Sequence, residues 1–89
     1  MEYEWHPVKA ADNRRKHGIA FDAITDFDWD TAVIVVDERK DYGEARFLAI
    51  GMIGQQLHSV AFTLRNAKVR VISLRAAGRK ERKLFDEAR

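Results

Sequence analysis

The architecture of this chain follows from one stretch, Gln56–Phe85, which reads QLHSVAFTLRNAKVRVISLRAAGRKERKLF. Leu57–Arg65 and Lys68–Arg75 are rich in the β-branched and aromatic residues that suit a half-buried pleated surface. Only Asn66 and Ala67 separate these runs, and Asn tolerates a positive φ, so the connection predicts a hairpin with a two-residue turn. A short, very basic helix is expected to follow the hairpin.

Positive charge is concentrated in the same stretch. From Arg65 through Lys83 there are eight Lys or Arg residues and a single acid, Glu81. Asp22–Arg46, by contrast, holds eight acids and three bases, so the net charge of +2 conceals an acidic half and a basic half. This division is typical of a protein with a polyanion site on one side and a separate partner surface on the other. Solvated charges that bind no ligand would give the same pattern.

Composition narrows the class of protein. The 89 residues suffice for one domain, 1–89, with a single modest core, and 46% hydrophobic with 34% charged residues indicates a globular chain. The lack of cysteine excludes disulfides and thiolate chemistry, and a cytoplasmic location is expected. No apolar run approaches the roughly 18 residues of a membrane span, and the three histidines lack a short metal-ligand spacing. Neither a membrane segment nor a bound metal or cofactor is therefore expected.

The chain before the hairpin predicts further strands. Glu44–Ile53 alternates like a strand, and Gly54 with Gln55 is expected to turn it into the hairpin. Ala32–Val36 is the most β-like run in the chain, and Glu2–Trp5 is a short possible strand. Together these segments predict a small antiparallel sheet, made of a four-stranded meander plus a short N-terminal strand.

Two helices are predicted near the N-terminus. Pro7 fits the first turn of the first helix, and Gly18 is a natural left-handed stop after a basic last turn. The apolar face of this helix is thin, formed by Val8 and Ala11, which indicates a surface helix. Ile19–Phe27 has apolar residues at helical spacing and predicts a second, short helix. With the C-terminal helix, the pattern predicts an α+β domain.

The turn also predicts which side chains share a face. If Arg65 pairs with Lys68, counting back along the hairpin places His58 opposite Arg75. A similar turn after the preceding strand places Gly51 beside His58, which would leave open space over that imidazole. The hairpin therefore predicts a cationic cluster at its turn end and a His–Arg pair at its other end.

Clustered cations of this kind suit RNA cleavage without a metal. In that reaction the 2′-hydroxyl attacks the adjacent phosphate, which needs a base, an acid and cations on the developing charge. Lys, Arg and His supply all three roles, and Arg binds phosphate oxygens through a bidentate fork. A basic hairpin is more often a binding surface than a nuclease site, so a noncatalytic nucleic-acid-binding module or a protein-interaction module explains the same residues.

Three segments of the chain resemble the BrnT-type toxins. The opening YEWHPVKAADNRRKHGIAFDAITDF resembles the family pattern W-D-x-x-K-x-x-x-N-x-x-K-H-G-[IV]-x-F through Trp5, Lys9, Asn13, Lys16, His17, Gly18, Ile19 and Phe21. GEARFLAIGMI resembles the family's central G-E-x-R-F-x-x-I-G strand. The end of the chain resembles T-x-R-x-x-x-x-R-I-I-S-A-R-x-A-x-x-x-E-R through Thr63, Arg65, Arg70, Ser73, Arg75, Ala77, Glu81 and Arg82.

The resemblance implies a RelE-like ribonuclease, the toxin of a type II toxin–antitoxin pair. Such a toxin cuts RNA and inhibits translation, is neutralised by a small DNA-binding antitoxin, and forms a homodimer within the complex. Matching positions imply that Arg65 and Arg75 contact the phosphate or transition state, with His17 or His58 as the acid–base group. The expected RNA-binding residues are Lys68, Arg70, Arg79 and Lys80.

Two positions depart from the family pattern. His6 stands where the family usually has Asp, and Phe85 stands where an aromatic hydroxyl is often found. If that hydroxyl assists the chemistry in relatives, this chain uses another group or has less activity.

Overall fold

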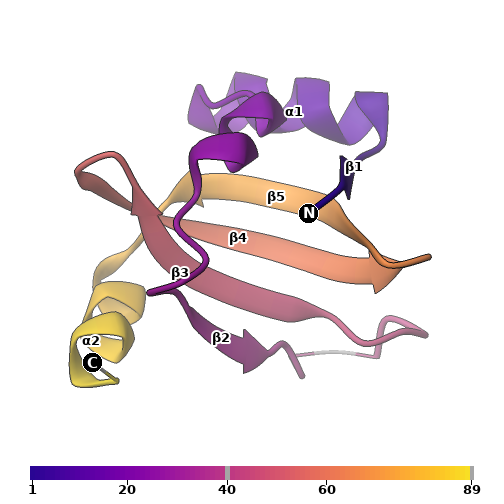
Figure 1. Cartoon of the computed structure of the whole chain (residues 1–89). Coiled ribbons are helices and arrows are strands. Elements are labelled where there is room, and N and C mark those ends of the chain that lie inside the picture. Colours follow the sequence, from indigo (N-terminus) through magenta and orange to yellow (C-terminus); the bar gives the residue numbers. More distant parts are fainter. Residues whose placement is uncertain (40, 89) are drawn as a thin grey trace.

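A five-stranded sheet forms the centre of the computed structural model, which describes residues 1–39 and 41–88 (Figure 1). Residues 40 and 89 of the expected domain 1–89 lie outside the described residues. The strands lie side by side in the order β1-β5-β4-β3-β2. Their bounds are Tyr3–Glu4 (β1), Val33–Val36 (β2), Phe47–Ile53 (β3), Gln56–Arg65 (β4) and Lys68–Ala76 (β5).

The predicted four-stranded antiparallel meander is confirmed, but the sheet as a whole is mixed. β2, β3, β4 and β5 are antiparallel neighbours, whereas β1 runs parallel to β5, with Tyr3 beside Val69. The Val69 N–H donates to the Glu2 carbonyl at 2.9 Å, which fixes this edge of the sheet. The prediction of a purely antiparallel sheet was wrong, because a two-residue strand has too little pattern to indicate its direction.

The hairpin turn forms as the sequence predicts. Asn66 and Ala67 both have positive φ, 52° and 63°, and Arg65 pairs with Lys68. Positive φ at both central residues gives a two-residue turn the twist that matches its flanking strands. Gly51 lies beside His58, as expected from the preceding turn.

A β-bulge then changes the predicted register of the hairpin. The pairing shifts between Phe62 and Ala61, so that Ala61 lies opposite Ser73 and Ile72 is the extra residue of β5. As a result, His58 lies opposite Ala76. The predicted pairing of His58 with Arg75 was wrong, because one extra residue moves every later side chain to the other face.

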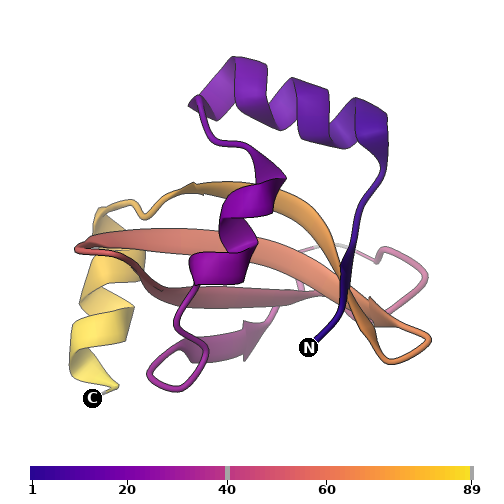
Figure 2. The ribbon, with the colours of Figure 1, turned by 45° about the horizontal axis from the view of Figure 1, so that its top comes forward.

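The three helical segments are α1 (Pro7–His17), the 3-10 helix η1 (Phe21–Asp26) and α2 (Arg79–Glu87). Figure 2 shows η1 on the side of the sheet away from α2, whereas α1 lies along the β5 edge. Gly18 ends α1 with φ 72°, the left-handed stop that the sequence predicts. The expected second helix is present and has the tighter 3-10 form.

Asn13 attaches α1 to the edge of β5. Its amide nitrogen donates to the Leu74 carbonyl at 2.7 Å and to the Ile19 carbonyl at 3.1 Å, and its oxygen accepts from the Leu74 N–H at 3.1 Å. Asn13 is buried, whereas Val8 is 60% exposed. The helix is thus a surface helix, as its thin apolar face predicts, and it docks by satisfying the peptide groups of a strand edge.

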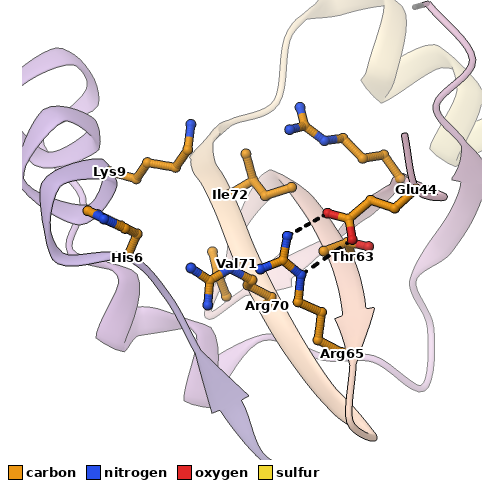
Figure 3. Close-up of a pocket in the computed structure, with 9 residues that line it drawn as sticks. His6, Lys9, Glu44, Thr63, Arg65, Arg70, Val71 and Ile72 are labelled. Carbon is orange, nitrogen blue, oxygen red and sulfur yellow. Dashed lines mark hydrogen bonds and ion pairs between the residues drawn. The ribbon is translucent and has the colours of Figure 1, made fainter. Parts of the chain in front are cut away.

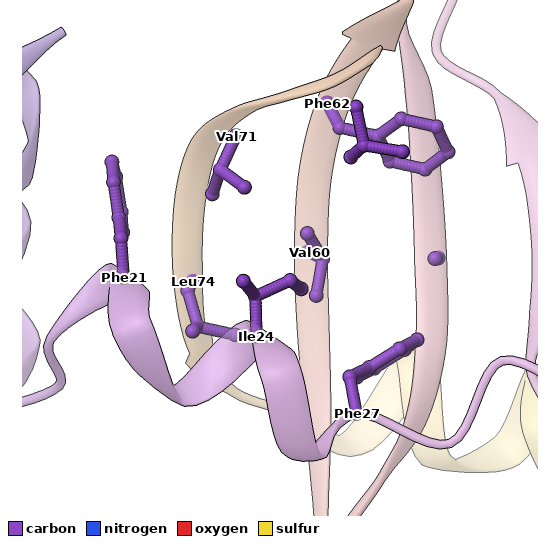
Figure 4. Close-up of a cluster of buried hydrophobic side chains, with 9 residues drawn as sticks. Phe21, Ile24, Phe27, Val60, Phe62, Val71 and Leu74 are labelled. Atoms are coloured by element: carbon purple, nitrogen blue, oxygen red, sulfur yellow. The ribbon is translucent and has the colours of Figure 1, made fainter. Parts of the chain in front are cut away.

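The main core lies between η1 and one face of the sheet, which we call the η1 face. Figure 4 shows Phe21 and Ile24 of η1, and Phe27 directly after it, next to strand residues that include Val60 and Leu74. A Cβ at Gly51 would lie 2.6 Å from the Phe27 ring, so this ring fills the space that the sequence predicted to be open beside His58. Gly51 thus allows the Phe27 ring to pack directly against β3.

A smaller core lies on the opposite face, which we call the α2 face. Phe85 of α2 is 3% exposed and belongs to a buried cluster with Ile50 and Leu57. Figure 1 shows α2 covering only one end of this face. Phe85 is therefore a packing residue, and the uncovered part of the α2 face extends toward the hairpin turn.

Candidate active site

A cationic cavity of about 140 Å³ lies at the uncovered, turn-proximal end of the sheet (Figure 3). Thr63 and Arg65 project from the same side of β4 as Leu57, because side chains alternate along a strand. The cavity therefore belongs to the α2 face. Its lining residues include four Lys or Arg side chains, one His and one carboxylate: His6, Lys9, Glu44, Arg46, Thr63, Arg65, Arg70, Val71 and Ile72. We call this cavity the cationic cleft.

Arg65 and Glu44 form a bidentate pair at the rim of the cationic cleft. Arg65 donates from Nη2 to Glu44 Oε1 at 2.8 Å and from Nε to Oε2 at 3.3 Å (Figure 3). The hydrogen bond from Arg65 is the main reason why the pKa of Glu44 lies below its ordinary value. This arrangement fixes an arginine fork in the geometry that also suits two phosphate oxygens.

Arg70 enters the cationic cleft from β5 and is held by Glu4 of β1. Glu4 and Arg70 are cross-strand partners in the parallel pair, and Arg70 Nη1 donates to Glu4 Oε2. Both side chains are partly buried, which strengthens the pair relative to a fully solvated one. The expected hairpin cluster of Arg65 and Arg70 is thus brought together by the structure.

Arg46 is a cleft residue that sequence reasoning missed. Its guanidinium carbon lies 3.8 Å from the centroid of the Tyr42 ring, an arrangement in which the ring face attracts the cation. Its Nε is buried and has no hydrogen-bond partner among the described residues. The G-E-x-R-F motif contained the signal, but the pattern alone does not show that the segment before β3 reaches the hairpin.

Thr63 holds that segment in place. This side chain is 2% exposed, and its Oγ1 donates to the Ala45 carbonyl at 2.7 Å. Ala45 lies between Glu44 and Arg46, so one hydrogen bond fixes the backbone that carries both functional side chains. The T-x-R motif therefore combines a positioning residue with a cation two residues later.

His6 and Lys9 complete the cationic cleft from the start of α1. The His6 Nδ1 accepts a hydrogen bond from the Val8 N–H at 3.1 Å, as an N-terminal cap of the helix. An Nδ1 that accepts cannot carry a proton, so the ring proton lies on Nε2. In this arrangement His6 caps the helix, and Lys9 brings an ammonium group to the cleft.

A second cavity of about 160 Å³ continues from the cationic cleft along α1. Lys9 and Ile72 line both cavities, and the second also contains Lys16 and His17. The predicted site residue His17 therefore lies near the cationic cleft along the groove between α1 and β5. His17 lines this second cavity and not the cationic cleft itself.

Arg75 lies at the other end of the sheet, where it is held by α2. The Glu81 carboxylate accepts from Arg75 Nη1 at 2.7 Å and Nη2 at 2.6 Å, from Gly78 N–H at 2.8 Å and from Ser59 Oγ at 3.1 Å. Burial would raise the pKa of Glu81, but the hydrogen bonds from Arg75 and Gly78 lower it below its ordinary value. Arg75 is thus committed to attaching α2.

The structure does not bring the remaining predicted residues into the cationic cleft. His58 is 6% exposed, shares the η1 face with Val60, and has its Nδ1 2.9 Å from the Gln56 carbonyl. Lys68 lies at the turn, 3.8 Å from Glu2. Arg79 and Lys80 begin α2, next to Glu81.

Two further observations concern metals and membranes. Within residues 1–39 and 41–88, no three His, Asp or Glu side chains are grouped closely enough to hold a metal ion. None of the helices described is both long and apolar enough to cross a membrane.

Comparison with known proteins gives one family. The chain matches the family described as "Ribonuclease toxin, BrnT, of type II toxin-antitoxin system" over residues 5–81, which includes every lining residue of the cationic cleft. No curated protein matches the chain. The match covers far more than half of the 89 residues. The chain therefore belongs to the BrnT family of ribonuclease toxins of type II toxin–antitoxin systems.

Proposed function

We propose that this protein is a metal-independent, RelE-like endoribonuclease that binds the scissile phosphate of RNA in the cationic cleft. The observation that carries the proposal is the convergence of Lys9, Arg46, Arg65 and Arg70 on one cavity of about 140 Å³. These residues come from four separate segments of the chain. Guanidinium groups that converge in this way can bind the non-bridging oxygens and stabilise the charge that develops on them.

The ion pairs of the free protein support a phosphate as ligand. Arg65 and Arg70 are each held by a carboxylate, Glu44 and Glu4. A carboxylate presents two oxygens to a guanidinium much as a phosphate does. RNA can therefore exchange with these carboxylates, and the arginine side chains are ordered before substrate arrives.

Glu44 is the group we assign as proton acceptor. When the phosphate takes the Arg65 fork, the Glu44 carboxylate is released beside it and can remove the proton from the 2′-hydroxyl. The 2′-oxygen forms a bond to phosphorus, the bond from phosphorus to the 5′-oxygen breaks, and the Lys9 ammonium gives its proton to that leaving oxygen. The products are a 2′,3′-cyclic phosphate and a 5′-hydroxyl.

The groove beside α1 supports a path for the strand. Because Lys9 belongs to both cavities, an RNA backbone whose phosphate sits at Arg65 can continue past Lys16 and His17. His17 then binds the neighbouring nucleotide. Arg79 and Lys80 line neither cavity.

The biological role we propose follows from this chemistry. Cleavage of messenger RNA in the cytoplasm inhibits translation, and a DNA-binding antitoxin neutralises the toxin by covering the cationic cleft. The homodimer that the resemblance implies within the toxin–antitoxin complex also stays a prediction.

The test is gel analysis of a defined messenger RNA incubated with purified protein, both naked with EDTA present and in a translation extract. Arg70→Ala is expected to reduce cleavage about 100-fold, the usual effect of losing one group that stabilises the transition state. Arg15→Ala is the matched control, because Arg15 is 73% exposed and pairs only with Asp12 among the described residues.

The outcomes separate the proposed nuclease from the alternatives. Fragments from the wild type and from Arg15→Ala, but not from Arg70→Ala, would support the proposal. Cutting only in the extract would indicate dependence on the ribosome. Intact RNA in both settings, with salt-dependent binding, would indicate a noncatalytic RNA-binding module.

A further inference from the structure

β2 is an unprotected edge of the sheet. It is the last strand in the order β1-β5-β4-β3-β2, and among the described residues it pairs only with β3. Edge strands of monomeric proteins usually carry a Lys, a Pro or a bulge that prevents pairing with another chain. Val33–Val36 reads VIVV and has none of these.

The hydrogen-bonding groups of this edge can be assigned to individual residues. The Asp37 N–H donates to the Arg46 carbonyl at 2.8 Å, so residues 33, 35 and 37 direct their peptide groups toward β3. Along an antiparallel pair, residues alternately direct their peptide groups toward the partner strand and away from it. The N–H and C=O of Ile34 and Val36 therefore point away from β3. Two residues offer complete pairing groups to an incoming strand.

An apolar groove adjoins the same edge. It has a volume of about 270 Å³, lies on the η1 face, and all of its lining side chains are apolar or aromatic: Met1, Trp29, Ile34, Phe47, Phe62, Leu64 and Val69. Ile34 is 50% exposed, Leu64 57% and Val36 57%. A strand added to β2 would direct its alternate side chains toward this groove, because partners across a ladder share a face.

The surroundings of β2 are acidic. From Asp28 to Glu38 there are four acids and no base. Asp37 is ionised, because the hydrogen bonds from Arg39 lower its pKa to about 2, and the Arg39 guanidinium compensates its charge; Asp28, Asp30 and Glu38 are exposed. Basic residues at both ends of an incoming segment would therefore meet complementary charge.

A second copy of this chain does not carry the basic ends that this surface would attract, because Asp30 precedes its own β2 strand and Asp37 and Glu38 follow it. A different protein, with basic residues at the ends of its segment, is the better match, and a second copy is tested as the alternative occupant.

We infer that the β2 edge and its apolar groove bind an extended segment of a partner protein, with apolar residues at alternate positions and Lys or Arg at its ends. The segment adds a sixth strand to the sheet beside Ile34 and Val36. The cationic cleft lies on the opposite face, so this surface is distinct from the RNA site. The inference does not depend on the proposed RNA chemistry.

The test measures amide hydrogen exchange by NMR in the full chain with a synthetic peptide as probe. The peptide has Val at alternate positions, Ser between them and two Lys residues at each end; its control carries Glu in place of every Lys. The Lys peptide is expected to slow exchange at the Ile34 and Val36 amides about tenfold at 90% occupancy. Its affinity should fall as salt is added.

Variants locate the site. The double variant Ile34→Lys with Val36→Lys is expected to lose the protection, whereas Val8→Lys, at another exposed apolar residue, retains it. Unchanged exchange with the Lys peptide at saturating concentration, or equal protection by the Glu peptide, would overturn the inference. Protection of both amides in the free chain together with a dimer in sedimentation would also overturn it, in favour of a second copy. These readouts on the wild type stand even if the double variant does not fold.

Discussion

Glu44 and Arg65 hold each other at the rim of the cationic cleft, and this pair determines how the free protein differs from its RNA complex. The hydrogen bond from Arg65 lowers the pKa of Glu44 in the free chain. Once phosphate takes the guanidinium, that cause is removed and the pKa of Glu44 rises toward or above its ordinary value. Under the proposed mechanism, Glu44 is therefore a stronger base when substrate is present.

Replacing Glu44 separates binding from chemistry. Glu44→Gln should bind RNA as tightly as the wild type or more tightly, because a neutral amide competes less for Arg65, while cleavage falls at least about 100-fold. In the wild type, kcat/KM should fall below pH 4.5, the ordinary pKa of Glu44, and kcat should fall at a higher pH than kcat/KM.

Measuring both RNA affinity and cleavage rate for Glu44→Gln distinguishes two roles of Glu44. Cleavage by Glu44→Gln at the wild-type rate would contradict the role as proton acceptor while leaving the nuclease proposal intact. Faster cleavage would show that Glu44 only competes with RNA for Arg65. Filter binding and single-turnover cleavage on one RNA give both quantities.

Single residues also show where sequence reasoning reached its limit at the site. Arg65 and Arg70 were predicted together, because a two-residue turn fixes the register near it. Arg46 and Glu44 were not predicted, because they belong to a segment before β3 that reaches the hairpin only through the Thr63 hydrogen bond. Periodicity describes faces of regular elements and carries no information about such a contact.

Among the elements, α1 is held mainly by a polar contact. Asn13→Ala would leave the buried Leu74 N–H and C=O without their partners. We expect the free energy of unfolding to fall by about 2–4 kcal/mol, since each buried unsatisfied group costs about 1–3 kcal/mol. Urea denaturation measures this loss. Ala11→Ser, on the exposed side of the same helix, is the control.

The attachment of α2 depends on the ionised form of Glu81. Its pKa is lower in the folded chain than its ordinary value of 4.5, so its stabilisation is present above pH 4.5 and is lost as the pH falls through the lowered value. Glu81→Gln should lower the unfolding free energy at pH 7 by about 2 kcal/mol, the loss of hydrogen bonds to a charged group.

The pH dependence tests the cause of this effect. Denaturation curves between pH 7 and pH 3 should show the wild type approaching Glu81→Gln as the carboxylate protonates. A constant difference in unfolding free energy between the two proteins over the whole pH range would contradict an ion pair between Glu81 and Arg75 as the attachment of α2.

The elements themselves differ in how well the sequence predicts them. The hairpin turn was predictable because Asn66 favours positive φ. The bulge at Ile72 was not, because the residues around it are apolar on both faces and fit either register. The bulge displaced Arg75 from the expected partner His58 and so changed the predicted site more than any other feature.

At the scale of the whole molecule, we expect charge to determine where RNA runs. Single-stranded RNA binding loses about 0.7 in the slope of log K against log salt for each phosphate contact removed. Lys16→Ala should therefore reduce the slope by about 0.7, because Lys16 lines the groove beside α1. Arg79→Ala should leave the slope unchanged. The opposite ranking would place the RNA path past Arg79, which is one of the RNA-binding residues expected from the sequence.

The division into acidic and basic halves was visible in the sequence and is kept in the fold. The order of residues could not show that some basic side chains gather in the cationic cleft while Arg75 pairs with Glu81 at the opposite end of the same face. That division arises when β1 and α1 pack against β5, a contact between the two ends of the chain.

This contact between the ends of the chain has a consequence for biosynthesis. β1 and α1 are made first, but their partner β5 leaves the ribosome only when Lys68–Ala76 has been translated and has cleared the exit tunnel. Until then Glu4 has no Arg70 and Asn13 has no Leu74 to bind. A nascent chain therefore has no complete cationic cleft. The proposed ribonuclease therefore becomes competent only after β5 has been made and has paired with β1 and α1.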